Sequence, residues 1–133
     1  MKRCLFLVAI VIFFVSSLQA QKNKPNYNWQ KLATASVDFK SNKNAVTLPA
    51  SDNFKSLQIR TGSSPVHIDN LVVVYETGDP ENVPVRFDFK PNTESRAIPL
   101  SNNKNKIKEV DIVYRAVVNT KVDNAEIEIW GSK

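Results

Sequence analysis

Apolar and polar residues alternate along most of the chain beyond residue 28, in short segments that end at Asn, Asp, Gly, Ser or Pro. Alternation with a period of two places apolar side chains on one face of a β-strand. The most regular case is the segment 83–89, where Val and Phe alternate with Arg86 and Asp88. Further strands are expected at 36–39, 46–48, 57–59, 66–68, 71–75, 93–100, 110–118 and 125–130. No segment repeats apolar residues with helical spacing, so the pattern predicts an all-β chain.

Breaks in the alternation predict where strands are irregular. Asp69 and Asn70 are expected to kink the chain before the apolar run 71–75, which is typical of a strand covered on both faces. Pro84 lacks a backbone donor, so its strand is expected to begin at a sheet edge. Ile107 is out of step with Val110, which predicts a bulge near Lys108–Glu109.

The segment 93–118 is expected to form two strands joined by a polar loop. In a regular strand Arg96 shares a face with Ile98 and Leu100 and would point toward the core. Because an unpaired buried charge is costly, we expect Arg96 to face the core or its rim beside an acid, Glu94 or Asp111. Arg96 would then either pin the hairpin or offer a donor fork to an anionic or sugar ligand.

The number of strands decides the architecture. About eight or nine short strands exceed one flat sheet, and the short loops between them favour antiparallel pairing. We therefore predict an all-β, two-sheet antiparallel β-sandwich that is jelly-roll-like, with a small barrel as the alternative.

Residues 1–20 have the layout of a cleaved secretory signal peptide. Met1-Lys2-Arg3 is positive, residues 5–15 are apolar, and small and polar residues lead to Ala20, where cleavage is expected. The eleven apolar residues are too few to span a bilayer, which takes about 20. We expect an exported protein, periplasmic or extracellular, without membrane insertion once the leader is removed.

Removal of the leader changes the composition that matters. It leaves 113 residues, lowers the net charge from +5 to +3, and removes Cys4, the one cysteine. We expect a polar arm at 21–28 and a single β-sandwich domain at 29–133. The small surplus of scattered lysines does not support nucleic-acid binding.

Short motifs through the mature chain resemble a family of small exported bacterial β-sandwich proteins of unknown function. That resemblance implies a sandwich domain in a bacterial envelope or extracellular setting and transfers no catalytic residue. The motifs are Trp29-Gln30-Lys31-Leu32, Phe54 to Ile59, Ile68 to Tyr75, Glu94 to Leu100 with its Ser-Arg-x-Ile-x-Leu pattern, Ile107 to Val110, and Ala125 to Gly131 with its terminal Trp-Gly.

Candidate chemistry is sparse. His67 is the one histidine, and no Gly-x-Ser-x-Gly elbow supplies a nucleophile beside it. One histidine without a mature cysteine does not suit a zinc site, and no cofactor or metal is expected. Loop pairs such as Asp52–Asn53 and Asp69–Asn70 offer oxygen ligands to calcium, but they lack calcium-loop spacing and also simply make turns.

Trp130 has a side-chain face opposite to Ile129 in the last strand. One interpretation is that Trp130 is exposed and available to stack on a sugar or to contact a partner. The alternative is that the end of the sandwich curls and buries it. An apolar sheet face for a partner is expected from Val72 or Val74, Val113, Val117 and Trp130.

Two function classes follow from these features. The leading one is a non-catalytic exported module that binds a sugar, a protein or a small anion, with Arg96, Trp130, Glu94 and Asp111 as candidate ligand-binding residues. The alternative is an envelope glycan hydrolase with paired carboxylates. The pattern specifies neither the partner nor an oligomeric state.

Overall fold

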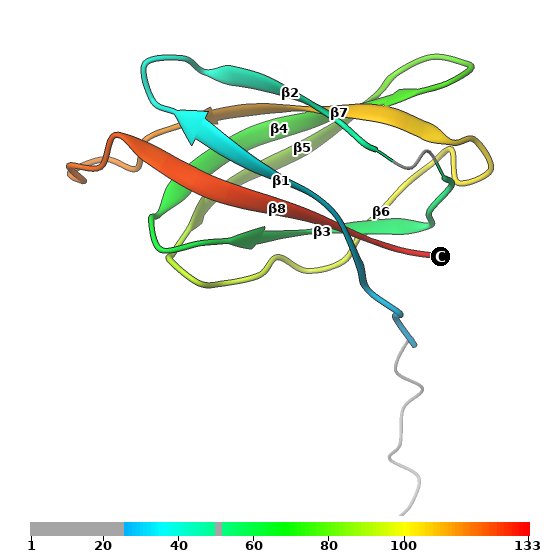
Figure 1. Cartoon of the computed structure of the whole chain (residues 1–133), viewed down its shortest axis with the longest axis horizontal. Helices are drawn as coiled ribbons and strands as arrows, with labels where there is room; N and C mark the ends of the chain where they lie inside the picture. Colours follow the sequence, from blue (N-terminus) through cyan, green and yellow to red (C-terminus); the bar gives the residue numbers. More distant parts are fainter. Residues whose placement is uncertain (1–25, 50–51) are drawn as a thin grey trace, which may run out of the picture.

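The computed structural model describes residues 26–49 and 52–133, and these contain eight strands and no helix (Figure 1). The strands are β1 (Gln30–Asp38), β2 (Lys43–Thr47), β3 (Ser56–Thr61), β4 (Val66–Tyr75), β5 (Glu81–Phe89), β6 (Ile98–Pro99), β7 (Ile107–Arg115) and β8 (Asn124–Ser132). The all-β prediction is confirmed, and no membrane-spanning helix occurs within the described ranges. The expected leader 1–20 and most of the arm lie outside those residues, so the boundaries at 20 and 28 stay predictions.

The strands form two antiparallel four-stranded sheets with the orders β1-β8-β3-β6 and β2-β7-β4-β5. First pairs with last, second with seventh, third with sixth and fourth with fifth. This nested pairing is that of a jelly roll. The β-sandwich prediction is therefore confirmed, and the small-barrel alternative is wrong because the two sheets do not close on one another.

The core lies between the two sheets and is built from alternate residues of each strand. Ile127 and Ile129 of β8 and Ile59 of β3 are buried on one side, and Ile112 and Leu71 on the other. Burial of apolar surface contributes about 25 cal/mol per Å², so the period-two pattern sets which face turns inward.

Strand β4 confirms the expected kink and corrects the expected burial. Its register shifts between Ile68 and Asn70 against both neighbours. However, the run 71–75 is not covered on both faces: Leu71 and Val73 are buried, whereas Val72 and Val74 keep partial exposure. The strand is central because it pairs on both edges, yet the outer face of its sheet carries no second layer.

The predicted hairpin over 93–118 is wrong. Residues 93–99 run along β3 in one sheet, whereas β7 pairs with β2 and β4 in the other. The polar loop therefore crosses between sheets, and the regular part of the first strand shrinks to the two residues of β6. Strand β7 ends at Arg115, so Val118 lies in a loop and is exposed.

Two local predictions hold. Val74 pairs with Glu109 and Tyr75 with Ile107, which leaves Lys108 as the bulge residue. The proline-containing strand β5 lies at an edge. Its alternation is nevertheless broken, because Arg86 has a φ of 46° and Phe87 is 56% exposed.

Candidate functional site

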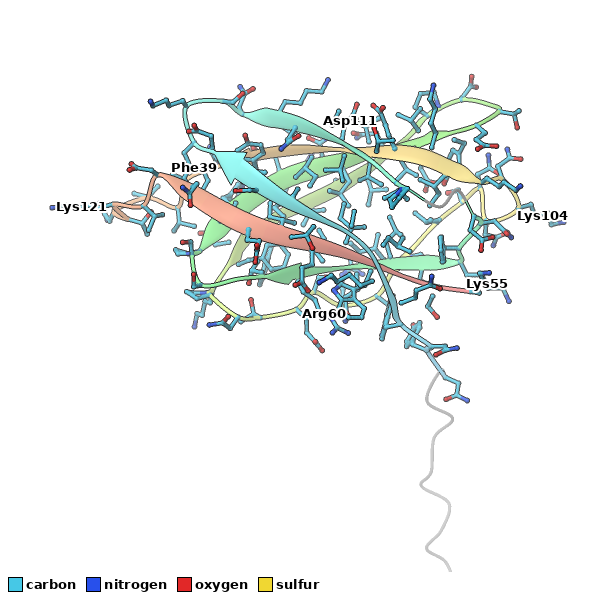
Figure 2. All side chains as sticks on the ribbon, viewed as in Figure 1. Phe39, Lys55, Arg60, Lys104, Asp111 and Lys121 are labelled. Carbon is cyan, nitrogen blue, oxygen red and sulfur yellow. The ribbon has the colours of Figure 1, made fainter. Side chains whose placement is uncertain are left out.

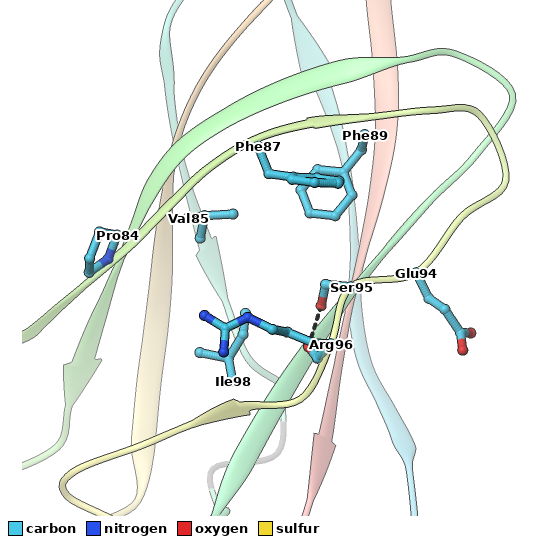
Figure 3. Close-up of a pocket in the computed structure, with 8 residues that line it drawn as sticks. All are labelled: Pro84, Val85, Phe87, Phe89, Glu94, Ser95, Arg96 and Ile98. Carbon is cyan, nitrogen blue, oxygen red and sulfur yellow. Dashed lines mark hydrogen bonds between the residues drawn. The ribbon is translucent and has the colours of Figure 1, made fainter.

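A cavity of about 250 Å³ lies at the open side of the sandwich, between the edge strand β5 and the segment that leads into β6 (Figure 3). On the opposite side of the molecule the edge strands β1 and β2 of the two sheets are in contact. The cavity side stays open because β6 is too short to cover the gap. The lining residues are Pro84, Val85, Phe87, Phe89, Glu94, Ser95, Arg96 and Ile98.

Ser95 determines how the chain passes the cavity. Its backbone N–H donates to the Ile59 carbonyl oxygen at 2.8 Å, and its hydroxyl oxygen accepts the Ile59 N–H at 2.9 Å. The side chain thus takes a position that a backbone carbonyl holds in a regular ladder. Between the Leu57–Ile98 pair and the Arg60–Glu94 bridge the segment has one more residue than β3, which is a bulge.

This bulge corrects the expected direction of Arg96. Because the extra residue shifts the side-chain parity, Arg96 is exposed and lines the cavity, whereas Ile98 keeps its place in the core. Its guanidinium extends toward Ile98 and Val85 rather than into the core (Figure 3). The rim position was expected, but the acid beside it is absent: within residues 26–49 and 52–133 the Arg96 guanidinium has neither an ion pair nor a hydrogen bond.

Glu94 also lines the cavity, but it belongs to a different ion pair. Its Oε2 lies 3.5 Å from Nε of Arg60, which also donates to Oε1 of Gln58 at 2.9 Å. The Glu94 carboxylate points away from Arg96 (Figure 3). The predicted Arg96–Glu94 pair is therefore wrong, although both residues belong to the same cavity.

Asp111 lies far from this cavity. It is on β7, on the outer face of the sheet β2-β7-β4-β5 and on the side of the sandwich opposite Arg60 (Figure 2). Its nearest ionisable neighbour along the strand is Glu109, whose pKa is raised by the hydrogen bond that its protonated carboxyl donates to Asp111, by burial and by the Asp111 charge. One buried Asp111 oxygen, Oδ1, has no hydrogen-bond partner in the described part of the chain.

Trp130 occupies the outer face of the other sheet. The Arg60 guanidinium carbon lies 3.8 Å from the ring centroid, and the indole N–H donates to Oε1 of Glu128 at 2.9 Å. Trp130 is half-buried because the Arg60 guanidinium covers its ring, and not because the end of the sandwich curls over it. Trp130 and Val72 therefore lie on different sheets, so the single apolar partner face expected from both is wrong.

Sequence reasoning missed the apolar wall of the cavity. Phe87 and Phe89 were expected on one face of their strand, but Phe89 is buried in the core whereas Phe87 is 56% exposed. Their rings line the cavity as an edge-to-face pair with centroids 4.9 Å apart. The one sequence signal was Pro84, which marks an edge strand where the sandwich is open. The left-handed Arg86 backbone, which redirects the Phe87 ring outward, has no signal in the sequence.

His67 lies outside the cavity in a charged cluster on β4. Its Nδ1 contacts Asp88, and its Nε2 lies 3.2 Å from Asp69 and 3.2 Å from Nη2 of Arg115. No Ser, Thr or Cys hydroxyl or thiol hydrogen-bonds this histidine in the described ranges. Those ranges also contain no cluster of three or more His, Cys, Asp or Glu side chains that could hold a metal ion.

Comparisons with known proteins place the chain without assigning an activity. No curated protein matches it. Among solved structures it is similar to "Structure of infectious bursal disease virus Gx strain", with a TM-score of 0.40 and 14% identity, over 90% of this chain and 35% of that chain. The family model described as "Domain of unknown function (DUF2541)" matches residues 6–131. Since that match covers nearly the whole sequence, the chain belongs to this family of unknown function.

Proposed function

We propose that this protein is an exported, non-catalytic binding module that holds a small ligand in the cavity between β5 and β6. The observation that carries the proposal is the Arg96 guanidinium, which lines an otherwise mainly apolar cavity and has no partner among the described residues. A concave, mostly apolar site with a few polar groups is the usual form of a small-molecule site.

The walls suit an apolar ligand body. Val85 and Phe89 come from one sheet and Ile98 from the other, and Phe87 adds an aromatic face that is 56% exposed. A ligand seated here would remove that ring from water, at a gain of about 25 cal/mol per Å² of apolar surface. Because edge strands frame the cavity, ligand entry does not require the two sheets to separate.

Export is the second part of the proposal and rests on the leader-like residues 1–20. Expression of the full chain in a bacterium should give a periplasmic or secreted product that begins at Gln21, as read by intact mass. A product that retains Met1 in the cytoplasmic fraction would contradict export without affecting the cavity.

The alternative of a glycan hydrolase lacks a comparable observation. Glu94 is the one carboxylate among the lining residues in the described part of the chain, and it is paired with Arg60. Asp111 and Glu109 lie on the outer face of the sheet β2-β7-β4-β5, away from the cavity. Neither arrangement places two acids across a cleft, which is the geometry that supports such an enzyme.

Methyl NMR of the full chain tests whether the cavity binds ligands. We expect titration with 1-octanol and with sodium octanoate to shift the methyl signals of Val85 and Ile98, which line the cavity, and to leave Val72 and Val113 unchanged. Phe87→Ala should weaken these shifts, whereas Val118→Ala, at an exposed loop position, should not. Equal shifts at all four methyl positions, or none with either compound, would refute the proposed site.

A further inference from the structure

The cavity presents a single positive charge. Among the described residues that line it, Arg96 is the one cation. Glu94 is the other charged lining residue, but its carboxylate is paired with Arg60 at 3.5 Å and turns away from Arg96 (Figure 3). Together Arg60, Glu94 and Arg96 carry one net positive charge, and the part of that charge that faces the cavity is the guanidinium of Arg96.

A guanidinium without a protein partner selects for a particular kind of anion. Its planar fork of N–H donors matches the two oxygens of a carboxylate. A doubly charged phosphate would bring a second negative charge near Glu94, and no second cation lies among the described lining residues to balance it. The charge count therefore favours a ligand with one negative charge.

The cavity volume limits the apolar part of the ligand. An apolar cavity of about 150 Å³ holds one benzene molecule, which is roughly 25 Å³ per carbon. On that scale the volume of about 250 Å³ accommodates about ten carbon atoms. This volume is surrounded by aliphatic and aromatic side chains from both sheets, namely Val85, Phe89 and Ile98. Apart from the charged Arg96 and Glu94, the hydrogen-bonding side chain among the described lining residues is Ser95.

Ser95 does not compete for the anion. Its hydroxyl accepts the Ile59 N–H and donates to the Arg96 carbonyl oxygen at 2.7 Å, so its one donor is already used. The same hydrogen bonds hold the backbone on either side of Arg96. The donor fork of Arg96 thus extends from a fixed point on the chain.

We infer that the ligand is a monocarboxylate with an apolar body of about ten carbons or fewer, with its carboxylate on Arg96 and its body against Val85, Phe89 and Ile98. This inference rests on the proposed function and names the ligand class for the same cavity. Medium-chain fatty acids and aryl-alkanoic acids have this chemistry, whereas alcohols, amines and dianionic phosphates of equal length lack it.

The test compares ligands that share one chain and differ in head group. Dissociation constants for octanoate, 1-octanol, octylammonium and octyl phosphate are measured with the full chain by methyl NMR at Val85 and Ile98. We expect octanoate to bind about ten- to a hundredfold tighter than octanol, the ratio expected for a charge-assisted hydrogen bond. Octyl phosphate should bind no tighter than octanoate, and octylammonium should bind more weakly than octanol.

Two variants localise the head group. Arg96→Met retains the apolar stem and should reduce octanoate affinity to that of octanol, with octanol affinity unchanged. Arg115→Met is the matched control, because Arg115 is an exposed arginine on β7 outside the cavity lining, and it should preserve the ratio. Thermal unfolding of both variants verifies that they fold.

The outcomes separate the inference from the proposed function. If octanol and octanoate both shift Val85 and Ile98 with equal affinity, the carboxylate inference fails and the binding cavity stands. The inference also fails if octyl phosphate binds tightest, or if Arg115→Met lowers octanoate affinity as much as Arg96→Met does. If no compound shifts these methyl groups, the proposed function itself fails.

Discussion

Ser95 and Ile59 share two hydrogen bonds, one from the Ser95 N–H to the Ile59 carbonyl oxygen at 2.8 Å and one from the Ile59 N–H to the Ser95 hydroxyl at 2.9 Å. The side chain of Ser95 thus replaces a backbone acceptor in the ladder beside β3. This pairing creates the bulge that places Arg96 on the cavity instead of in the core.

Removal of the Ser95 hydroxyl should destabilise the fold. In Ser95→Ala the Ile59 N–H loses its acceptor in a part-buried position, which costs about 1–3 kcal/mol. For a domain of this size each kcal/mol lowers Tm by roughly 4–8 °C. Ser95→Thr retains the hydroxyl and should unfold near the native temperature; equal losses in both variants would show that the hydroxyl is not responsible.

Glu81 should make stability depend on acid pH. It accepts the Tyr75 hydroxyl at 2.6 Å and the Ser101 N–H at 3.0 Å. Burial raises the pKa of Glu81, but the hydrogen bonds from Tyr75 and from Ser101 outweigh burial, and the net pKa lies below the usual glutamate value. A lowered folded pKa means that this stabilisation is complete above the unfolded pKa and is lost as pH falls through the folded pKa.

The variant Glu81→Gln should therefore lose about 1 kcal/mol at pH 7, a value reduced for the partial exposure of the group. The difference from the native chain should shrink as pH falls below the ordinary glutamate pKa. Urea unfolding at a series of pH values measures it. Asp123→Asn, at an exposed loop position, is the control, and a constant Glu81→Gln difference at every pH would contradict the assignment.

Replacement of Asp111 by Asn should stabilise the protein. The hydrogen bond that protonated Glu109 donates to Asp111 is the main cause of the raised pKa of Glu109, followed by burial and the Asp111 charge. A raised carboxyl pKa in the folded state lowers stability as pH rises past the unfolded value. Because solvent screens charges this close to the surface, Asp111→Asn should raise Tm by only about 1–3 °C at pH 7, which is less than 1 kcal/mol in such a domain, and should have no effect near pH 3. A lower Tm at pH 7 would contradict this account.

Gly131 should not tolerate a side chain. A Cβ at this position would lie 2.9 Å from Cδ1 of Leu32 and 2.9 Å from Cδ1 of Phe54, and Phe54 is buried in the core. Gly131→Ala should cost about 1–3 kcal/mol through overpacking. In Gly62→Ala the new Cβ would lie 3.1 Å from Cβ of the exposed Glu126, so this substitution should destabilise the fold less than Gly131→Ala. Denaturant midpoints of the two variants give the comparison, which fails if Gly62→Ala is the more harmful.

Arg60 should shield the Trp130 indole from solvent. Its guanidinium carbon lies 3.8 Å from the ring centroid. With Trp29→Phe as the background, Arg60→Ala should increase acrylamide quenching of Trp130, shift its emission to the red, and cost about 0.5–1 kcal/mol of cation–π energy. Arg115→Ala, on the other sheet, should change neither signal; an unchanged spectrum in Arg60→Ala would show that the guanidinium does not cover the ring.

The sequence pattern predicted much of the fold because side-chain alternation is a local property of the pleated backbone. The apolar residues of β3, β7 and β8 take the faces that their period assigned, and a lone extra residue at Lys108 was visible as a change of parity. The edge position of β5 followed from Pro84, which lacks a backbone donor. The glycine of the terminal Trp-Gly motif also has a packing reason, since Leu32 and Phe54 occupy the space of a Cβ.

The candidate site depended on relationships between residues distant in sequence. Hydrogen bonds from β3 place residues 93–99 in a different sheet from β7, and the polar loop between them is compatible with either arrangement. The Ser95 bulge inverts the parity that had assigned Arg96 to the core. The left-handed Arg86 backbone likewise turns Phe87 toward solvent.

By itself, then, the sequence determined the strand content, the inward faces of β3, β7 and β8, the sandwich class and the positions of two irregularities, because each is encoded by neighbouring residues. Only the tertiary structure decided which sheet each strand joins, that Glu94 pairs with Arg60, and that Arg96 lines an open cavity. These features arise from long-range backbone pairing and from one side-chain hydrogen bond that no alternation pattern records.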